Sequence, residues 1–222
     1  MLGWINCRVQ VLDELLRHDG LQDPASPPLC SNCLNNAGMH KCLDCSVMSS
    51  YCADCIISCH DELPLHRIEV CQSVLRFFLP MTFAQVWSDG FFQRTSLLEL
   101  GHSFHISHRH TPCPSPDSSF QKILVIDLNG AHYVNIQFCA CKDRPEWIEH
   151  YRQLLRMGWY PASFDRPRTA FTFDLLDTYH KLALQGKLSV YDFYAAVMQK
   201  SDNRGRRKVI VRKSVSVSSR VL

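Results

Sequence analysis

The chain has 222 residues, of which 46% are hydrophobic and 20% charged, and its formal net charge is +3 at pH 7. This composition is typical of a soluble protein with one sizeable domain or two small ones. No run approaches the ~20 apolar residues that a membrane helix needs, and charged residues interrupt the N-terminal stretch where a signal peptide would have its apolar core. We therefore expect a nuclear or intracellular protein with no membrane partner and no small-molecule substrate.

Residues 1–20 predict an amphipathic N-terminal helix. Its apolar side chains recur at helical spacing, and Gly20 stands just past the last of them. These side chains are Val9, Leu12, Leu15 and Leu16. Residues 21–29 include the proline-rich stretch QDPASPP, which is typical of a linker.

The twelve cysteines set this sequence apart, because seven of them lie between Cys30 and His66. Six of the seven form three Cys-x-x-Cys pairs, a spacing that presents two thiolates from one tight turn. In a reducing compartment such pairs are more often metal ligands than disulfides. Tetrahedral zinc takes four Cys or His ligands. The expected ligands of two closed zinc sites are, in chain order, Cys30, Cys33, Cys42, Cys45, Cys52, Cys55, His60 and His66.

These ligands can close the two sites in two ways. Neighbouring pairs can share an ion, or the first and third pairs can bind one ion while the second and fourth bind the other. The spacing within residues 30–69 resembles a B-box-type cross-brace finger. This resemblance assigns the first zinc to Cys30, Cys33, Cys52 and Cys55, and the second to Cys42, Cys45, His60 and His66. Cys59 stays open as an alternative to His60.

Such a finger points to a structural role for the metal. A segment of about forty residues cannot bury enough apolar surface to fold alone, so zinc supplies the missing stability. Four protein ligands leave no open position for water, and a zinc-bound thiolate is not available as a nucleophile. The sequence also contains no glycine-rich phosphate-binding loop. We therefore expect no catalytic residues.

The stretch KILVIDLNGAHYVNIQF predicts a β-hairpin. Two runs rich in β-branched residues flank Asn129–Gly130, the dipeptide that is preferred in two-residue hairpin turns. In that register Leu128 faces Ala131, and Lys122 faces Gln137. The two cysteines that follow the second strand then lie at the open end of the hairpin, on one face.

The open end of this hairpin predicts a third zinc site. Cys113 precedes the first strand, whose start lies beside Cys139 and Cys141 at the end of the second strand. A histidine of the preceding loop would complete the set, and the sequence leaves His108 and His110 as alternatives. We take His108 and predict the set His108, Cys113, Cys139 and Cys141.

Three helices are expected to follow the hairpin. Residues 145–158 begin with proline and end with glycine, and residues 172–186 also end with glycine. Residues 189–200 open with Ser189 and Asp192 in capping-box spacing. Residues 204–222 form a basic tail that we expect to be disordered. Its candidate contacts to nucleic acid are Arg204, Arg206, Arg207, Lys208, Arg212 and Lys213.

Several blocks of the sequence resemble, in the same order, the CxC2-like cysteine cluster domain that accompanies KDZ (Kyakuja-Dileera-Zisupton) transposases. They include LDELLRHDG, the cysteine-rich finger, WSDGFFQRTSL, CPSP and NGAHYVNIQFCAC, and the similarity runs from about Trp4 to Asn203. The resemblance implies a zinc-chelating region, normally fused upstream of a transposase, that binds DNA or a protein of the transposase complex. The metal positions of the family match the eight finger ligands, Cys113, Cys139 and Cys141.

The chain departs from this family in two places. Residues 70–86 contain an insertion, VCQSVLRFFLPMTFAQ, for which we consider a translated intron or an amphipathic loop insertion. The resemblance ends at Asn203, and the transposase core, with paired carboxylates for two metal ions, is not found after it. We therefore expect a protein that is not an enzyme.

Together these features predict a small, zinc-stabilised α+β protein. The expected domains are a helix (1–20), a linker (21–29), a B-box-like cross-brace finger (30–69), an insertion (70–86), a hairpin plus helical Cys-x-Cys module (87–203) and a tail (204–222). The expected function is that of a non-catalytic zinc-binding accessory module of transposon origin. The alternatives are a B-box-like protein-interaction module of the ubiquitin pathway and a decayed transposon fragment without activity.

Overall fold

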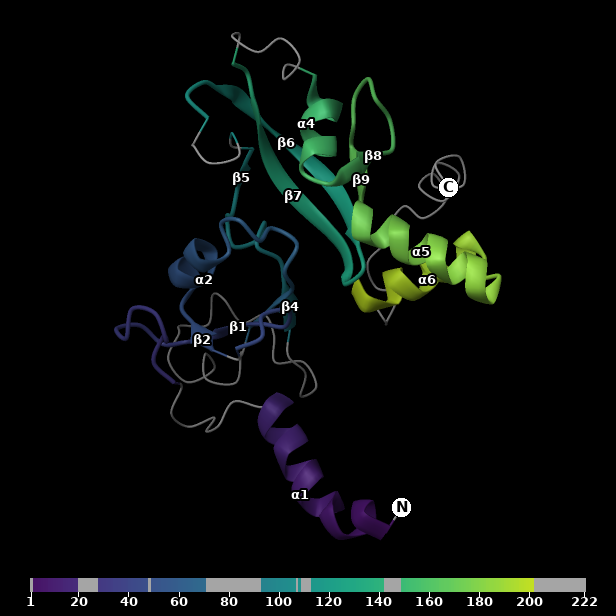
Figure 1. Cartoon of the computed structure of the whole chain (residues 1–222). Helices are drawn as coiled ribbons and strands as arrows, with labels where there is room; N and C mark the ends of the chain where they lie inside the picture. Colours follow the sequence, from purple (N-terminus) through teal and green to yellow (C-terminus); the bar gives the residue numbers. More distant parts are fainter. Residues whose placement is uncertain are drawn as a thin grey trace. The chain divides into compact units, whose positions relative to one another are not determined.

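The computed structural model describes residues 2–19, 28–47, 49–70, 93–106, 108, 113–141 and 149–201. These residues belong to two compact units, which Figure 1 draws in sequence colours. The first unit comprises residues 1–60 and 66–100, and the second comprises residues 61–65 and 101–222. The basic tail and nearly all of the insertion fall outside the described residues, so the domain limits given above stay predictions.

The first unit begins with the predicted helix and continues into a small antiparallel sheet. Helix α1 spans Leu2–Asp19, and most of its apolar side chains are exposed. A four-stranded antiparallel sheet in the order β2-β1-β3-β4 follows, with one short helix beside it. The elements are β1 (His40–Cys42), β2 (Ser50–Tyr51), α2 (Ala53–Cys59), β3 (Ile68–Val70) and β4 (Gln93–Thr95). The sequence did not predict this sheet.

The hydrophobic core of the first unit is very small. It consists of Cys42, Ile56, Ile68 and Leu97, with a few partly buried neighbours. One of these four side chains is itself a predicted metal ligand. A core of this size buries little apolar surface, which is the situation in which small domains depend on a metal ion.

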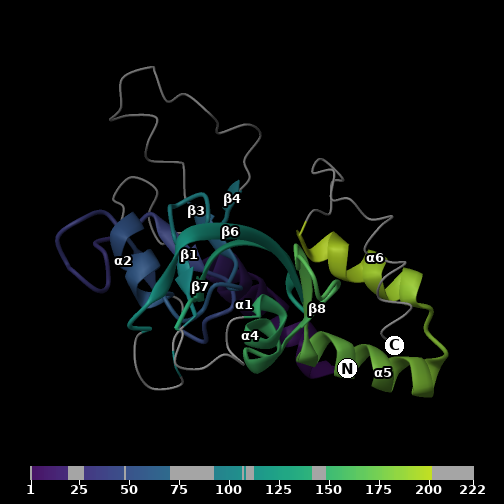
Figure 2. The same ribbon diagram turned by 90° about the horizontal axis from the view of Figure 1, so that it is seen from above.

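The second unit is built on a five-stranded mixed sheet in the order β5-β7-β6-β9-β8 (Figure 1). Figure 2 shows its long strands β6 and β7 from above. The long antiparallel pair β6 and β7 occupies its centre. The strands are β5 (Phe104–His105), β6 (Pro116–Asp127), β7 (Gly130–Cys139), β8 (Trp159–Pro161) and β9 (Thr169–Thr172). The helices are α4 (His150–Arg156), α5 (Phe173–Gly186) and α6 (Val190–Ser201).

The run Ile123–Ile126 is buried on both faces of this sheet, which explains why its hydrophobicity does not alternate. Ile123 and Val125 belong to one core cluster, together with Leu154 of α4. The side chains of Leu124 and Ile126 belong to a second cluster, which α5 and α6 complete. Helix α4 on one face of the sheet, and α5 and α6 on the other, therefore cover the part of the hairpin that pairs with β9.

The predicted hairpin is present, but its register differs from the expectation. Lys122 pairs with Asn135 rather than Gln137, and Asp127 pairs with Gly130, so Leu128 and Asn129 form the turn. A type I′ turn needs a positive φ at both central residues; here only Gly130, just past the turn, has one, at 138°. The shift of two residues leaves every side chain on its expected face, so burial does not oppose it.

The three C-terminal helices are confirmed, with differences at their ends. Helix α4 begins at His150, and residues 142–148 lie outside the described part of the chain. Helix α5 includes Gly186, and the left-handed position belongs instead to Lys187, at φ 51°. The hydroxyl of Ser189 accepts a hydrogen bond from the backbone N–H of Asp192 at 3.1 Å, as the capping spacing predicts. Among the described residues, no helix has the length and apolar character needed to cross a membrane.

Candidate metal centres

The structure brings the first and third Cys-x-x-Cys pairs of the finger together. We call this group centre 1; it consists of Cys30, Cys33, Cys52 and Cys55. Cys30 and Cys33 flank a tight turn in which the N–H of Leu34 donates to the carbonyl of Cys30 at 2.9 Å. Cys52 is the N-cap residue of α2, and the helix carries Cys55 in its first turn. A turn and a helix start thus present the two pairs.

The sulfur geometry of centre 1 fits a tetrahedral zinc ion. The four ligand atoms lie within 4.8 Å of one another, and the Sγ atoms of Cys33 and Cys52 are 3.9 Å apart. A regular tetrahedron with Zn–S bonds of ~2.3 Å has S–S edges of about 3.8 Å. Burial raises the pKa of Cys30, but the backbone N–H groups of Cys33, Cys52 and Asn32 outweigh it and bring that pKa down to about 6. The turn therefore favours the thiolate that zinc requires.

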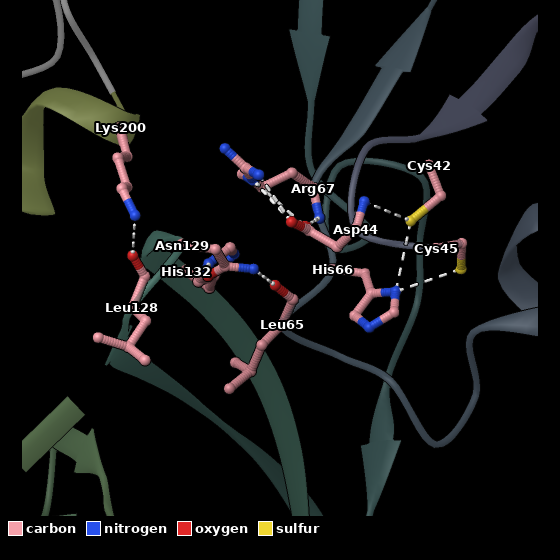
Figure 3. Close-up of polar contacts among 10 residues, drawn as sticks. All are labelled: Cys42, Asp44, Cys45, Leu65, His66, Arg67, Leu128, Asn129, His132 and Lys200. Carbon is pink, nitrogen blue, oxygen red and sulfur yellow. Dashed lines mark hydrogen bonds and ion pairs between the residues drawn. The ribbon is translucent and has the colours of Figure 1, made fainter. Parts of the chain in front are cut away.

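Centre 2 contains the second Cys-x-x-Cys pair and both histidines of the finger. Its members are Cys42, Cys45, His60 and His66. Nδ1 of His66 lies 3.3 Å from Sγ of Cys42 and 3.5 Å from Sγ of Cys45, as Figure 3 shows. The second histidine also contacts this pair: Nε2 of His60 lies 3.4 Å from Sγ of Cys45. These separations match the S–N edges of about 3.5 Å that a zinc tetrahedron requires.

The backbone of α2 orients His60 toward this centre. His60 is 1% exposed, and its Nδ1 lies 2.8 Å from the carbonyl oxygen of Ile56. A proton on Nδ1 donates to that carbonyl and leaves Nε2 as the ligand atom. The neighbouring Cys59 is exposed and is not part of the cluster. The structure thus brings His60, rather than Cys59, to the centre.

An ion pair braces the two halves of centre 2. Asp44 lies inside the Cys42-x-x-Cys45 turn, and Arg67 directly follows His66. The guanidinium of Arg67 donates through Nη2 to Oδ1 of Asp44 at 2.7 Å, and its backbone N–H donates to Oδ2 at 2.6 Å (Figure 3). Burial raises the pKa of the Asp44 carboxyl, but the hydrogen bonds from Arg67 outweigh it and hold that pKa below its usual range. No local sequence pattern points to this pair.

Centre 3 belongs to the second unit and lies at the open end of the hairpin. It contains His108, Cys113, Cys139 and Cys141. Nε2 of His108 lies 3.2 Å from Sγ of Cys139 and 3.4 Å from Sγ of Cys141. Sγ of Cys113 lies 3.5 Å from that of Cys141. The pairing of Pro116 with Cys139 brings the two ends of the hairpin together, as the sequence predicted.

A buried glutamine on α4 holds the Cys139 backbone at centre 3. Gln153 accepts a hydrogen bond at Oε1 from the backbone N–H of Cys139 and donates through Nε2 to its carbonyl, both at 2.9 Å. Its side chain is completely buried. This contact could not be predicted either, because a glutamine within a helix gives no distinctive signal. The alternative ligand His110 lies outside the described residues.

The chemistry of the three donor sets fits zinc and a structural role. Each centre offers four Cys or His donors, and zinc prefers this combination in closed tetrahedral sites. Burial raises the pKa of Cys42 and of Cys139 to about 12, so these thiols would lose their protons only when a metal binds. Zinc bound by all four donors would have no open position for a substrate or water. The described part of the chain forms a metal-binding module in which Cys and His side chains cluster at ion-binding distance.

Comparisons with known proteins support one part of this description. Among curated proteins and among solved structures, nothing matches this chain. A family model, described as CxC2 like cysteine cluster associated with KDZ transposases, matches residues 97–205. This range contains centre 3, while the ligands of centres 1 and 2 precede it. The resemblance expected from the sequence is therefore confirmed for residues 97–205, which match a cysteine cluster domain associated with KDZ transposases rather than a catalytic domain.

Proposed function

We propose that this chain is a non-catalytic zinc-binding module of transposon origin that binds DNA in the nucleus, as an accessory to a KDZ-type transposase. The observation that carries the proposal is the grouping of four Cys or His donors at each of the three centres. Centres with four protein donors stabilise the fold, and catalysis would belong to another domain. The family match over residues 97–205 supports the link to transposition.

The metal ion in each centre would be zinc, and the full chain would hold three. Metal analysis by mass spectrometry under native conditions tests this number directly. A content of three zinc ions per chain is expected. A chain that is folded and lacks zinc would contradict the proposal.

A salt-dependent binding assay tests the DNA partner. Fluorescence anisotropy with labelled single-stranded and duplex DNA would compare the full chain with a variant that ends at Asn203. The basic tail adds phosphate contacts, so its removal should lower both the affinity and the salt dependence. The shorter variant should retain measurable binding, because the proposal assigns DNA binding to the folded part as well. Absence of binding by both proteins would overturn the proposal.

A second candidate function is a B-box-like protein-interaction module. The observation in its favour is the interleaved arrangement of centres 1 and 2, in which the first pair joins the third and the second joins the fourth. The same assay separates the two functions. Zinc content without DNA affinity would support the protein-interaction module and contradict DNA binding.

A further inference from the structure

One face of the second unit's sheet carries a regular set of polar and aromatic side chains. Strand pairing places them in rows across β6, β7 and β5. Phe120, Gln137 and His105 form the first row, and Lys122 and Asn135 form the next. Tyr133 stands beyond them, opposite Leu124. Side chains alternate between the faces of a strand, so these rows lie on one surface. We call this surface the aromatic face; it consists of His105, Phe120, Lys122, Tyr133, Asn135 and Gln137.

Helices α5 and α6 bury only one end of this side of the sheet and leave the aromatic rings exposed. Leu124 and Ile126, on the same side of β6, are buried in the cluster that the two helices complete. On the same side of the sheet, outside that cluster, Phe120 of β6 and Tyr133 of β7 are each 45% exposed. Isolated exposed apolar residues are ordinary, but two rings on the central strands of one sheet, with polar side chains between them, form a surface suited to a ligand.

Hydrogen bonds and a ring contact hold side chains of this face in place. The rings of His105 and Phe120 meet edge to face, with centroids 5.7 Å apart. Gln137 lies between them in the row: its Oε1 is 2.5 Å from Nδ1 of His105, and its Nε2 donates to the carbonyl of Asp117 at 2.7 Å. The amide of Asn135 donates to Oγ of Ser103 at 3.0 Å. The surface is therefore ordered before any ligand arrives.

The charge of the aromatic face complements phosphate. Nζ of Lys122 lies 4.6 Å from the centroid of the Tyr133 ring, and no residue of the face is acidic. A nucleic-acid strand offers flat bases to the rings and negative phosphates to the ammonium group. Proteins that bind single strands combine these two elements, stacking platforms and cationic side chains, often on an open sheet.

We propose that the aromatic face binds single-stranded DNA, with bases stacked on Phe120 and Tyr133 and a phosphate near Lys122. Gln137, opposite Phe120, is four residues from Tyr133 on β7, a separation of about 13 Å along the strand at ~3.3 Å per residue. The two rings therefore take bases that are not adjacent. Duplex DNA does not expose its base faces, so the face selects unpaired strands. This inference rests on the proposed DNA-binding function and adds its site and its strand preference.

The test measures binding of a fluorescein-labelled single-stranded DNA 20-mer and of its duplex to the full, zinc-loaded chain. The variants are Phe120→Ala, Tyr133→Ala and Lys122→Gln. Loss of one stacked base weakens single-strand binding about 5- to 150-fold. The lysine variant should lose affinity and reduce the slope of log K against log salt by about 0.7. The substitution Phe120→Tyr keeps a ring and should keep most of the affinity.

Matched controls lie elsewhere in the same unit. Phe173, also 45% exposed, and Tyr191, 66% exposed, lie on α5 and α6; their alanine variants should bind as the unchanged chain does. Circular dichroism and zinc content should stay the same for every variant. If the unchanged chain binds DNA while Phe120→Ala and Tyr133→Ala bind single strands equally well, the inference fails and the proposed function stands. Preference for duplex would also overturn the inference. If no DNA binds at all, the proposed function itself fails.

Discussion

Asp44 and Arg67 join the two ligand pairs of centre 2. Four hydrogen bonds connect them, three from the guanidinium and one from the backbone N–H of Arg67. Asp44 also donates its own backbone N–H to Sγ of Cys42 at 3.4 Å. The pair thus ties the Cys-x-x-Cys turn to the residue after His66. Bidentate pairs of this kind fix orientation as well as distance.

The first prediction concerns this brace. Asp44→Ala removes the hydrogen-bond acceptor of Arg67 and leaves the four ligands unchanged. The Cys42–Cys45 turn and His66 then lose the contact that orients them toward each other. Zinc affinity at this centre should fall about 10- to 100-fold, the usual effect of changing a residue that orients metal ligands. Competition with a chelator of known affinity measures this change. Asp177→Ala is the control, since the Asp177–Lys181 pair on α5 is largely exposed and contributes little. Equal zinc affinity of the two variants would contradict the role of the brace.

Removal of zinc should affect the two units differently. The first unit has a core of four buried residues, whereas the second contains two larger clusters around its sheet. A strong chelator should therefore unfold the finger and leave β6 and β7 protected. Hydrogen exchange followed by mass spectrometry would resolve the units peptide by peptide. Persistent protection of α2 and β1 without metal would show that apolar packing, rather than zinc, holds the finger.

Substitutions at the adjacent residues Cys59 and His60 test which of them is a zinc ligand. His60→Ala should reduce the zinc content by one ion per chain, because His60 is buried at centre 2. Cys59→Ser should leave the content unchanged, because the Cys59 thiol is exposed and outside the cluster. Native mass spectrometry counts the ions in both variants. The reverse result would exchange the two assignments.

Zinc binding should release protons. Burial raises the pKa of Cys42 and of Cys139 to about 12, so both thiols carry protons at neutral pH in the metal-free protein. Zinc binds the thiolate, and each of these protons must leave, so the affinity should fall as the pH falls. Calorimetric titrations in buffers of different ionisation enthalpy count the protons. A binding heat that does not depend on the buffer would contradict this prediction.

The hairpin turn provides a test of the fold. Gly130 has a φ of 138°, and a Cβ there would meet Oγ of Ser201. That hydroxyl also accepts the backbone N–H of Ala131 at 2.5 Å. Gly130→Ala should therefore destabilise the second unit by about 1–3 kcal/mol. In Gly186→Ala the new methyl group meets nothing within 4 Å, and this control should gain about 0.5–1 kcal/mol. Thermal unfolding of the zinc-loaded proteins measures both.

The ligand pairs of the finger could be recognised from sequence because their spacing is local, and the resemblance to a B-box-type cross-brace finger indicated which pairs share an ion. A Cys-x-x-Cys turn presents both sulfurs wherever it occurs, so only the partner of each pair had to be chosen. Centre 3 followed from the hairpin, since its two ends must meet when the strands pair. The structure brings together each set of four that the sequence proposed.

Features that depend on distant contacts could not be predicted in this way. The brace joins residues 23 positions apart, and the contact of Gln153 with Cys139 depends on where α4 packs. Strands β5 and β8 have two and three residues, too few for a periodic pattern. The register error has another origin: a shift of two residues preserves the inside–outside pattern, so hydrophobicity could not detect it.

The interleaving of centres 1 and 2 has a consequence for how the protein matures. The ribosome releases Cys30, Cys33, Cys42 and Cys45 before Cys52, and these four thiols can chelate one ion as a temporary set. The finished centres separate that set, with one pair going to each. An ion captured early must therefore exchange two of its ligands, for Cys52 and Cys55 at centre 1 or for His60 and His66 at centre 2. The nascent finger would then mature in two steps, capture of an ion by the first four thiols and transfer of that ion to its final ligands.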